Sequence, residues 1–140
     1  MIYVDANPFI YALAYNDNHP DTIKSKIFLS DVRRNKTQAC TTILTWDEVF
    51  YHLKRRMGEK VAIEKCKMLI SFPNLTFLDM TQNTINEAQK ICESYHLDPR
   101  DAIHSACAIS SCGGKIFSRD GDFDSVNGIH RIFTNYQKAT

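Results

Sequence analysis

Short apolar segments alternate with longer helix-like segments along this chain, and this alternation constrains the fold more than any other feature. Runs typical of strands occupy residues 2–4, 39–44, 75–78, 115–118 and 131–133. Segments with helical spacing of apolar residues occupy 19–34, 45–57, 59–71, 82–95 and 99–111, and a short helix is expected near Pro8. The alternation predicts an α/β fold with three layers, α/β/α, in which helices cover both faces of a mostly parallel sheet of about five strands.

The apolar spacing also predicts which side of each helix is buried. The residues expected to face the core are Ile23, Ile27, Phe28 and Val32 in the helix at 19–34, Trp46, Val49, Phe50 and Leu53 in the helix at 45–57, and Ile85, Ala88, Cys92 and Tyr95 in the helix at 82–95.

The size and composition of the chain fit one domain over residues 1–140. The formal net charge of +1 argues against a protein that binds nucleic acid mainly by bulk electrostatics, so any such contact should be a local patch. Five cysteines without a C-x-x-C pair are typical of free core thiols in a reducing compartment, and a zinc site is not expected. With no membrane-length apolar run and no signal peptide, we expect a soluble, cytoplasmic protein.

Four acidic residues stand where strands end or helices begin: Asp5, Glu48, Asp101 and Asp120. Asp5 and Asp120 follow strands, and Glu48 lies shortly after another. In α/β folds, ligands bind beyond the carboxyl ends of the strands, near the point where the strand order reverses. We therefore expect these side chains to lie along one edge of the sheet.

Each acid also has an ordinary structural explanation. Asp5 fits a turn or a helix cap, and Asp101 fits the first turn of a helix capped by Asp98. Residues 45–48 read Thr-x-x-Glu, a capping box, which is the favoured interpretation of Glu48 taken alone. Asp120, next to Gly121, fits a solvated turn.

Taken together, the acids indicate a cation site. Carboxylates held close to one another repel and raise each other's pKa unless a cation neutralises them. Oxygen ligands without companion His or Cys ligands suit Mg²⁺ or Mn²⁺, which can activate water and bind phosphoryl oxygens. The pattern therefore favours phosphoryl chemistry.

Four sequence segments carry a family resemblance: the strand ending at Asp5 with Asn7 two residues later, the Thr-x-x-Glu of 45–48, and residues 101–106 and 116–123. In their order and separation they make the chain resemble the PIN-domain nucleases over nearly its whole length. The resemblance is strongest to the VapC-like toxins of prokaryotic toxin–antitoxin pairs.

The resemblance implies an endoribonuclease in which Asp5, Glu48, Asp101 and Asp120 bind one or two Mg²⁺ or Mn²⁺ ions. It places Asp122 as a further carboxylate ligand, and it assigns hydrogen-bonding support of the cluster to Asn7 and Ser118. A metal-activated water would attack the RNA phosphodiester in line and leave a 5′-phosphate and a 3′-hydroxyl. The implied partners are an RNA substrate, a small antitoxin and a second copy of the chain, with the helices between 45 and 71 as one possible dimer interface. No membrane partner is expected.

Several interpretations stay open at this stage. The chain could instead be an RNA-processing nuclease, or a non-catalytic PIN-like module that binds RNA or protein. A phosphatase of the Asp-x-Asp type is disfavoured because Asn7 replaces the second aspartate. A receiver domain lacks its acidic pair, and a flavin module lacks its phosphate loop.

The remaining polar and aromatic residues have competing roles. For His104, a hydrogen-bonded and partly buried side chain is favoured over a general base. Five basic residues are expected to be solvated, and contact with RNA is the less favoured interpretation for them: Lys54, Arg55, Arg56, Arg100 and Arg119. Trp46 and Phe50 fit the core, or a dimer or antitoxin interface, better than a base-stacking platform.

Overall fold

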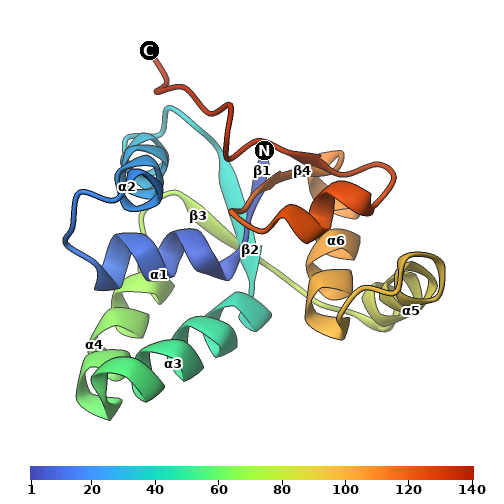
Figure 1. Cartoon of the computed structure of the whole chain (residues 1–140), viewed down its shortest axis with the longest axis horizontal. Coiled ribbons are helices and arrows are strands. Elements are labelled where there is room, and N and C mark those ends of the chain that lie inside the picture. The colour runs from blue at the N-terminus through green and yellow to red at the C-terminus, as the bar shows by residue number, and fades with distance from the viewer.

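A computed structural model describes all residues of the chain. Five strands and six α-helices alternate in it (Figure 1). In chain order they are β1 (Ile2–Val4), α1 (Ala6–Ala14), α2 (Pro20–Arg33), β2 (Ala39–Thr42), α3 (Ile43–Met57), α4 (Glu59–Ile70), β3 (Leu75–Leu78), α5 (Gln82–Tyr95), α6 (Pro99–Cys112), β4 (Lys115–Phe117), the 3₁₀ helix η1 (Gly121–Ser125) and β5 (His130–Arg131).

All five strands run parallel, in the order β3-β2-β1-β4-β5. The chain moves outward from β1 through β2 to β3, then returns to place β4 on the other side of β1. The strand order therefore reverses between β1 and β4, which is where an open α/β sheet forms its ligand site. Asp5 follows β1 and Ser118 follows β4, so both lie at this reversal.

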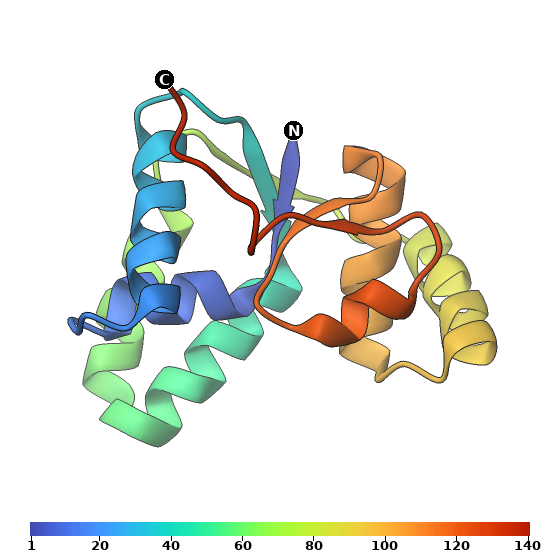
Figure 2. The same cartoon turned by 45° about the horizontal axis from the view of Figure 1, so that its top comes forward.

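Helices cover both faces of the sheet, as the sequence predicts. Helices α1 to α4 pack on one face and α5 and α6 on the other (Figures 1 and 2). The alternating directions of strand side chains divide β1 between the two cores: Val4 packs with α1 to α4, and Tyr3 packs with α6. No helix combines the length and hydropathy needed to span a membrane.

Three residues predicted to face the core are exposed instead, and one of them, Trp46 of α3, is 36% exposed. Ile23 of α2 is 44% exposed and Ile85 of α5 is 60% exposed. The buried side of α2 instead includes the polar residues Thr22, Ser25 and Asp31. Asp31 accepts hydrogen bonds from the C-terminal tail, and these bonds favour its burial. The spacing of apolar residues cannot predict such contacts, because the partners are distant in sequence.

The junction of β2 and α3 also differs from the prediction. The strand ends at Thr42 rather than at residue 44, and α3 begins at Ile43 rather than at Thr45. Thr45 therefore lies inside the first helical turn, where its hydroxyl accepts a hydrogen bond from Thr41 at 2.7 Å. The last strand is His130–Arg131 rather than residues 131–133.

Candidate functional site

Asp5 is both a helix cap and the buried centre of the acidic cluster. As the N-cap of α1 it accepts a hydrogen bond from the Ala6 amide at 2.7 Å through Oδ1. Its other oxygen, Oδ2, accepts from the Ser118 hydroxyl at 2.7 Å. The side chain is therefore fixed from both β1 and β4, the two strands at which the sheet order reverses.

Glu48 does not form the predicted capping box. Because α3 begins at Ile43, Glu48 lies in the second turn of the helix, beyond the reach of its N-terminal amides. Its carboxylate instead accepts a hydrogen bond from His104 Nε2 at 2.6 Å. Because α3 begins two residues earlier than predicted, Glu48 lies in the acidic cluster and not at a capping position.

His104 lies completely buried between the acids, more deeply than the partial burial expected from the sequence. Its Nε2 is 2.6 Å from Glu48 Oε1 and 3.4 Å from Asp5 Oδ1. Since a carboxylate only accepts hydrogen bonds, Nε2 carries the proton. The other ring nitrogen, Nδ1, lies 2.7 Å from the Tyr3 hydroxyl, which in turn is 3.0 Å from Thr42 Oγ1. Sequence reasoning did not identify Tyr3, because a tyrosine in an apolar strand looks like ordinary core.

Asp101, Asp120 and Asp122 form the second half of the cluster. Their carboxylate oxygens lie within 4.8 Å of one another, as do the ligand atoms of Asp5, Glu48 and His104 in the first half. Asp120 caps η1 by accepting from the Asp122 amide at 2.8 Å, so its turn role and its place in the cluster coexist. Ser118 joins the halves, because its hydroxyl donates to Asp5 and accepts from the Asp120 amide at 3.1 Å.

The pKa values of the cluster show that it holds excess negative charge. Burial raises the pKa of Asp5 above its ordinary value despite the nearby His104. Burial, and then the charges of Asp120 and Asp5, raise the pKa of Asp101 to about 7. Burial lowers the pKa of His104, but the hydrogen bond to Glu48 and the charge of Asp5 outweigh it, so the pKa lies above its ordinary value. The acids therefore compete for protons.

No lysine or arginine forms an ion pair with these carboxylates, although the charge of Arg131 interacts with that of Asp120. The two arginines beside the cluster are paired elsewhere: Arg119 Nε donates to Asp21 at 2.8 Å, and Arg131 binds Asp124 at 2.7 Å. His104 is the only ionisable base grouped with these carboxylates. A closely packed set of oxygen ligands with this charge fits a hard divalent cation such as Mg²⁺ or Mn²⁺.

The other predicted residues lie around the cluster or away from it. Asn7, on the first turn of α1, is half-buried and makes no hydrogen bond to the acids. Lys54 is 3.6 Å from Glu59, beyond the end of α3. Arg55, Arg56 and Arg100 are exposed.

Comparison with known proteins identifies the family. The PIN domain model matches residues 2–129, so the chain belongs to the PIN domain family. A comparison with curated protein sequences gives no match.

Solved structures share the fold over almost the whole chain. VapC20 from Mycobacterium tuberculosis, described as a sarcin-ricin loop cleaving toxin, matches with a TM-score of 0.70 and 16% identity, over 92% of this chain and 97% of the other. A toxin–antitoxin complex from Klebsiella pneumoniae matches with a TM-score of 0.66 and 18% identity, over 93% of this chain and 96% of the other. VapBC2 from Rickettsia felis, bound to a promoter DNA fragment, gives 0.67 and 18%, covering 92% and 96%. At these identities the likeness establishes the fold.

Proposed function

We propose that the chain is a Mg²⁺- or Mn²⁺-dependent endoribonuclease. The observation that carries the proposal is a pair of adjoining acidic groups, linked by Ser118 and without an ion pair to lysine or arginine: Asp5 and Glu48 with His104, and Asp101, Asp120 and Asp122. Membership of the PIN family supports the nuclease class. A bound divalent cation would supply an activated water and neutralise charge on the phosphodiester oxygens.

The protein's own residues would hold and orient the reacting groups. Asp5, Glu48, Asp101 and Asp120 are the proposed ligands, with Asp122 at the open margin of the cluster. Ser118 and His104 fix the carboxylates of Asp5 and Glu48 through short hydrogen bonds, which limits their rotation. Such supporting contacts orient ligands and increase their affinity for metal.

The test is cleavage of RNA by the purified protein with Mn²⁺, compared with EDTA. Glu48→Gln should abolish cleavage, whereas Asp47→Asn, which changes the exposed acid next to it on α3, should leave cleavage intact. A 5′-phosphate on the products would support the proposed in-line hydrolysis. Cleavage that persists in EDTA, or equal activity of the two variants, would exclude the proposal.

We further propose that this nuclease acts as the toxin of a toxin–antitoxin pair. The structures with the same fold include a toxin and two toxin–antitoxin assemblies, and this supports the assignment over an RNA-processing role. Expression should arrest growth in an Asp5-dependent manner, and a small protein encoded beside the gene should relieve the arrest. An isolated gene without toxicity would favour the processing role.

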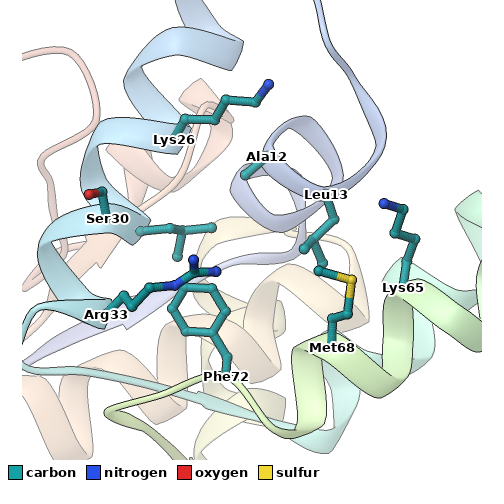
Figure 3. A pocket seen from close by; sticks show the side chains of 9 residues that line it. Ala12, Leu13, Lys26, Ser30, Arg33, Lys65, Met68 and Phe72 are labelled. Atoms are coloured by element: carbon teal, nitrogen blue, oxygen red, sulfur yellow. The ribbon is translucent and has the colours of Figure 1, made fainter.

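The apolar hollow between α1, α2 and α4 is the proposed binding site of the small antitoxin. It has a volume of about 270 Å³ and is lined by Leu13, Met68 and Phe72, with Lys26, Arg33 and Lys65 at its margin (Figure 3). This combination suits an amphipathic segment with acidic side chains. Met68→Glu should prevent capture of the partner and leave RNA cleavage intact, because the hollow lies outside the acidic cluster.

A homodimer is proposed as well. Helices α3 and α4 expose several large apolar side chains outside the hollow, a feature typical of protein interfaces: Ile43, Trp46, Met57, Ile63 and Ile70. Trp46 is 36% exposed, and its ring lies 5.4 Å from that of Phe50 between centroids at an angle of 48°, so it fits an interface better than the core. Light scattering should give twice the mass of one chain, and the Trp46→Glu variant should give the mass of a single chain.

A further inference from the structure

Two rows of side chains lead away from the acidic cluster along neighbouring helices. On α1, Tyr11 and the C-cap Tyr15 follow Asn7 at intervals of one turn. On α3, His52 and Arg56 follow Glu48 at the same interval. Both helices begin at the carboxyl edge of the sheet and run to the same side of the molecule (Figures 1 and 2). Eight residues of helix span about 12 Å, so each row reaches well beyond the cluster.

The rows meet to form one surface. The Tyr15 hydroxyl lies 3.3 Å from His52 Nε2, which joins α1 to α3. The rings of Tyr11 and Tyr15 are 5.9 Å apart at an angle of 42°, and both residues are half-buried, so part of each side chain faces solvent. We call the surface made by Tyr11, Tyr15, His52, Arg56 and Arg119 the α1–α3 strip.

Arg119 connects the strip to the acidic cluster. It stands between Ser118 and Asp120 in the chain, and its Nε donates to Asp21 beside Tyr11. Its terminal guanidinium nitrogens make no hydrogen bond within the protein, and the side chain is 54% exposed. Those N–H groups are free to bind a phosphate. Arg56 is exposed at the far end of the strip and lies close enough to His52 to lower its pKa, after the larger effect of burial.

We propose that the α1–α3 strip binds single-stranded RNA and guides it into the acidic cluster, with bases stacking on Tyr11 and Tyr15 and phosphates contacting Arg119 and Arg56. The inference rests on the proposed nuclease function for its direction, but the binding itself does not require catalysis. Partly exposed aromatic rings alternating with cations suit unpaired bases, because the π-face of every base can stack. Paired bases in a duplex keep their faces covered and would bind less well.

Binding can be measured without cleavage in an Asp5→Asn background. Fluorescence anisotropy with a short, labelled, non-self-complementary oligoribonucleotide gives the affinity directly. Tyr11→Ala and Tyr15→Ala should each weaken binding by about 5- to 100-fold, the range typical of losing one stacked base. Tyr11→Phe, which keeps the ring, should bind within about twofold of the parent, as the same stacking energy is retained. Arg119→Ala should reduce the salt dependence of binding by about one phosphate contact.

Tyr51→Ala serves as the matched control. Tyr51 is 62% exposed on α3 and precedes His52 in the chain, but it is not part of the α1–α3 strip. The Tyr51→Ala variant should therefore bind RNA with the affinity of the parent. In the active protein, Tyr11→Ala should raise KM for RNA and leave kcat nearly unchanged, a split that general destabilisation would not produce.

The outcomes separate the two proposals. If Tyr11→Ala, Tyr15→Ala and Tyr51→Ala all bind RNA like the parent, the strip is not the RNA site and its tyrosines only hold α1 against α3. If the variants weaken binding but the protein with intact Asp5 never cleaves RNA, the strip stands and the nuclease proposal fails. Equal affinity for duplex RNA would overturn the single-strand preference.

Discussion

Two buried aspartates, Asp5 and Asp31, occupy opposite kinds of environment in this protein. Asp31 is fully buried on α2 and accepts hydrogen bonds from the Tyr136 hydroxyl at 2.8 Å and the Ala139 amide at 2.7 Å, which attach the C-terminal tail. Asp5 is 5% exposed and also accepts two hydrogen bonds, but charged neighbours, His104 and Glu48, act on it as well. Burial alone therefore does not distinguish a structural acid from a proposed metal ligand. The distinguishing feature is the charge of the neighbours.

The physical consequence differs for the two residues. Two donors of the tail bind Oδ2 of Asp31 and stabilise its contact with the tail, while its Oδ1 is buried without a hydrogen-bond partner. Burial and, to a smaller extent, the charge of Glu48 disfavour the ionised form of Asp5 despite the nearby His104, and a proton or a metal ion would offset this. Replacing Asp5 should therefore affect activity, whereas replacing Asp31 should affect stability.

The largest expected effect is on catalysis at Asp5. Asp5→Asn should reduce RNA cleavage by at least about 100-fold, because loss of a supporting residue alone typically costs 10- to 100-fold. It should also abolish the rise in melting temperature on adding Mn²⁺, while melting without metal should not fall. Cleavage assays and thermal melts with and without Mn²⁺ measure both. A variant that melts lower but cleaves normally would place Asp5 with Asp31 as a structural residue.

Asp31→Ala should have the opposite profile. It leaves the Ala139 amide without its acceptor and removes one of the two partners of the Tyr136 hydroxyl, at a cost of about 1–3 kcal/mol in unfolding free energy. Urea denaturation measures the loss, and cleavage per folded molecule should be unchanged. Asp31→Asn, which keeps an acceptor oxygen, is the control, and its unfolding free energy should fall by less than that of Asp31→Ala. Loss of cleavage in the folded Asp31→Ala protein would contradict the comparison.

Tyr3→Phe tests the support behind the cluster. It removes the hydroxyl that contacts His104 Nδ1 and Thr42 while keeping the ring in the core. Weaker orientation of His104, and through it Glu48, should lower Mn²⁺ affinity by about 10-fold, at the low end of effects at supporting residues. A Mn²⁺ titration followed by cleavage measures the shift. Full recovery of the cleavage rate at saturating Mn²⁺ is expected, and unchanged affinity would show that Tyr3 only fills space.

The smallest effect concerns the pH dependence of stability without metal. The Asp101 pKa is about 7 in the folded protein, above its ordinary value of 3.8. The folded state therefore binds the proton more tightly, so the stabilisation is full below about pH 4 and is lost as pH rises through 7. In EDTA, the unfolding free energy of Asp101→Asn should increase relative to the natural protein between pH 5 and 8. A constant difference across that range would contradict the assigned pKa.

The strand–helix alternation was enough to predict the α/β fold, because strand and helix periods are local properties of the chain. Asp5 and Asp120 could likewise be assigned to one sheet edge from their places after strands. The boundary at Ile43 could not be predicted, since residues 39–44 have strand-like composition and only the tertiary contacts of Thr41 and Thr45 fix the start of the helix. This error is what made the capping box seem plausible for Glu48.

By itself, then, the sequence determined the layers, the order of the elements and the acids available for a site. Only the tertiary structure decided that His104 lies between Asp5 and Glu48, that Tyr3 supports it, and that nearby arginines pair elsewhere. The reason is that secondary structure follows from neighbours along the chain. The charge balance of a site depends instead on side chains that are far apart in sequence, and their distances are fixed only when the sheet and its helices pack together.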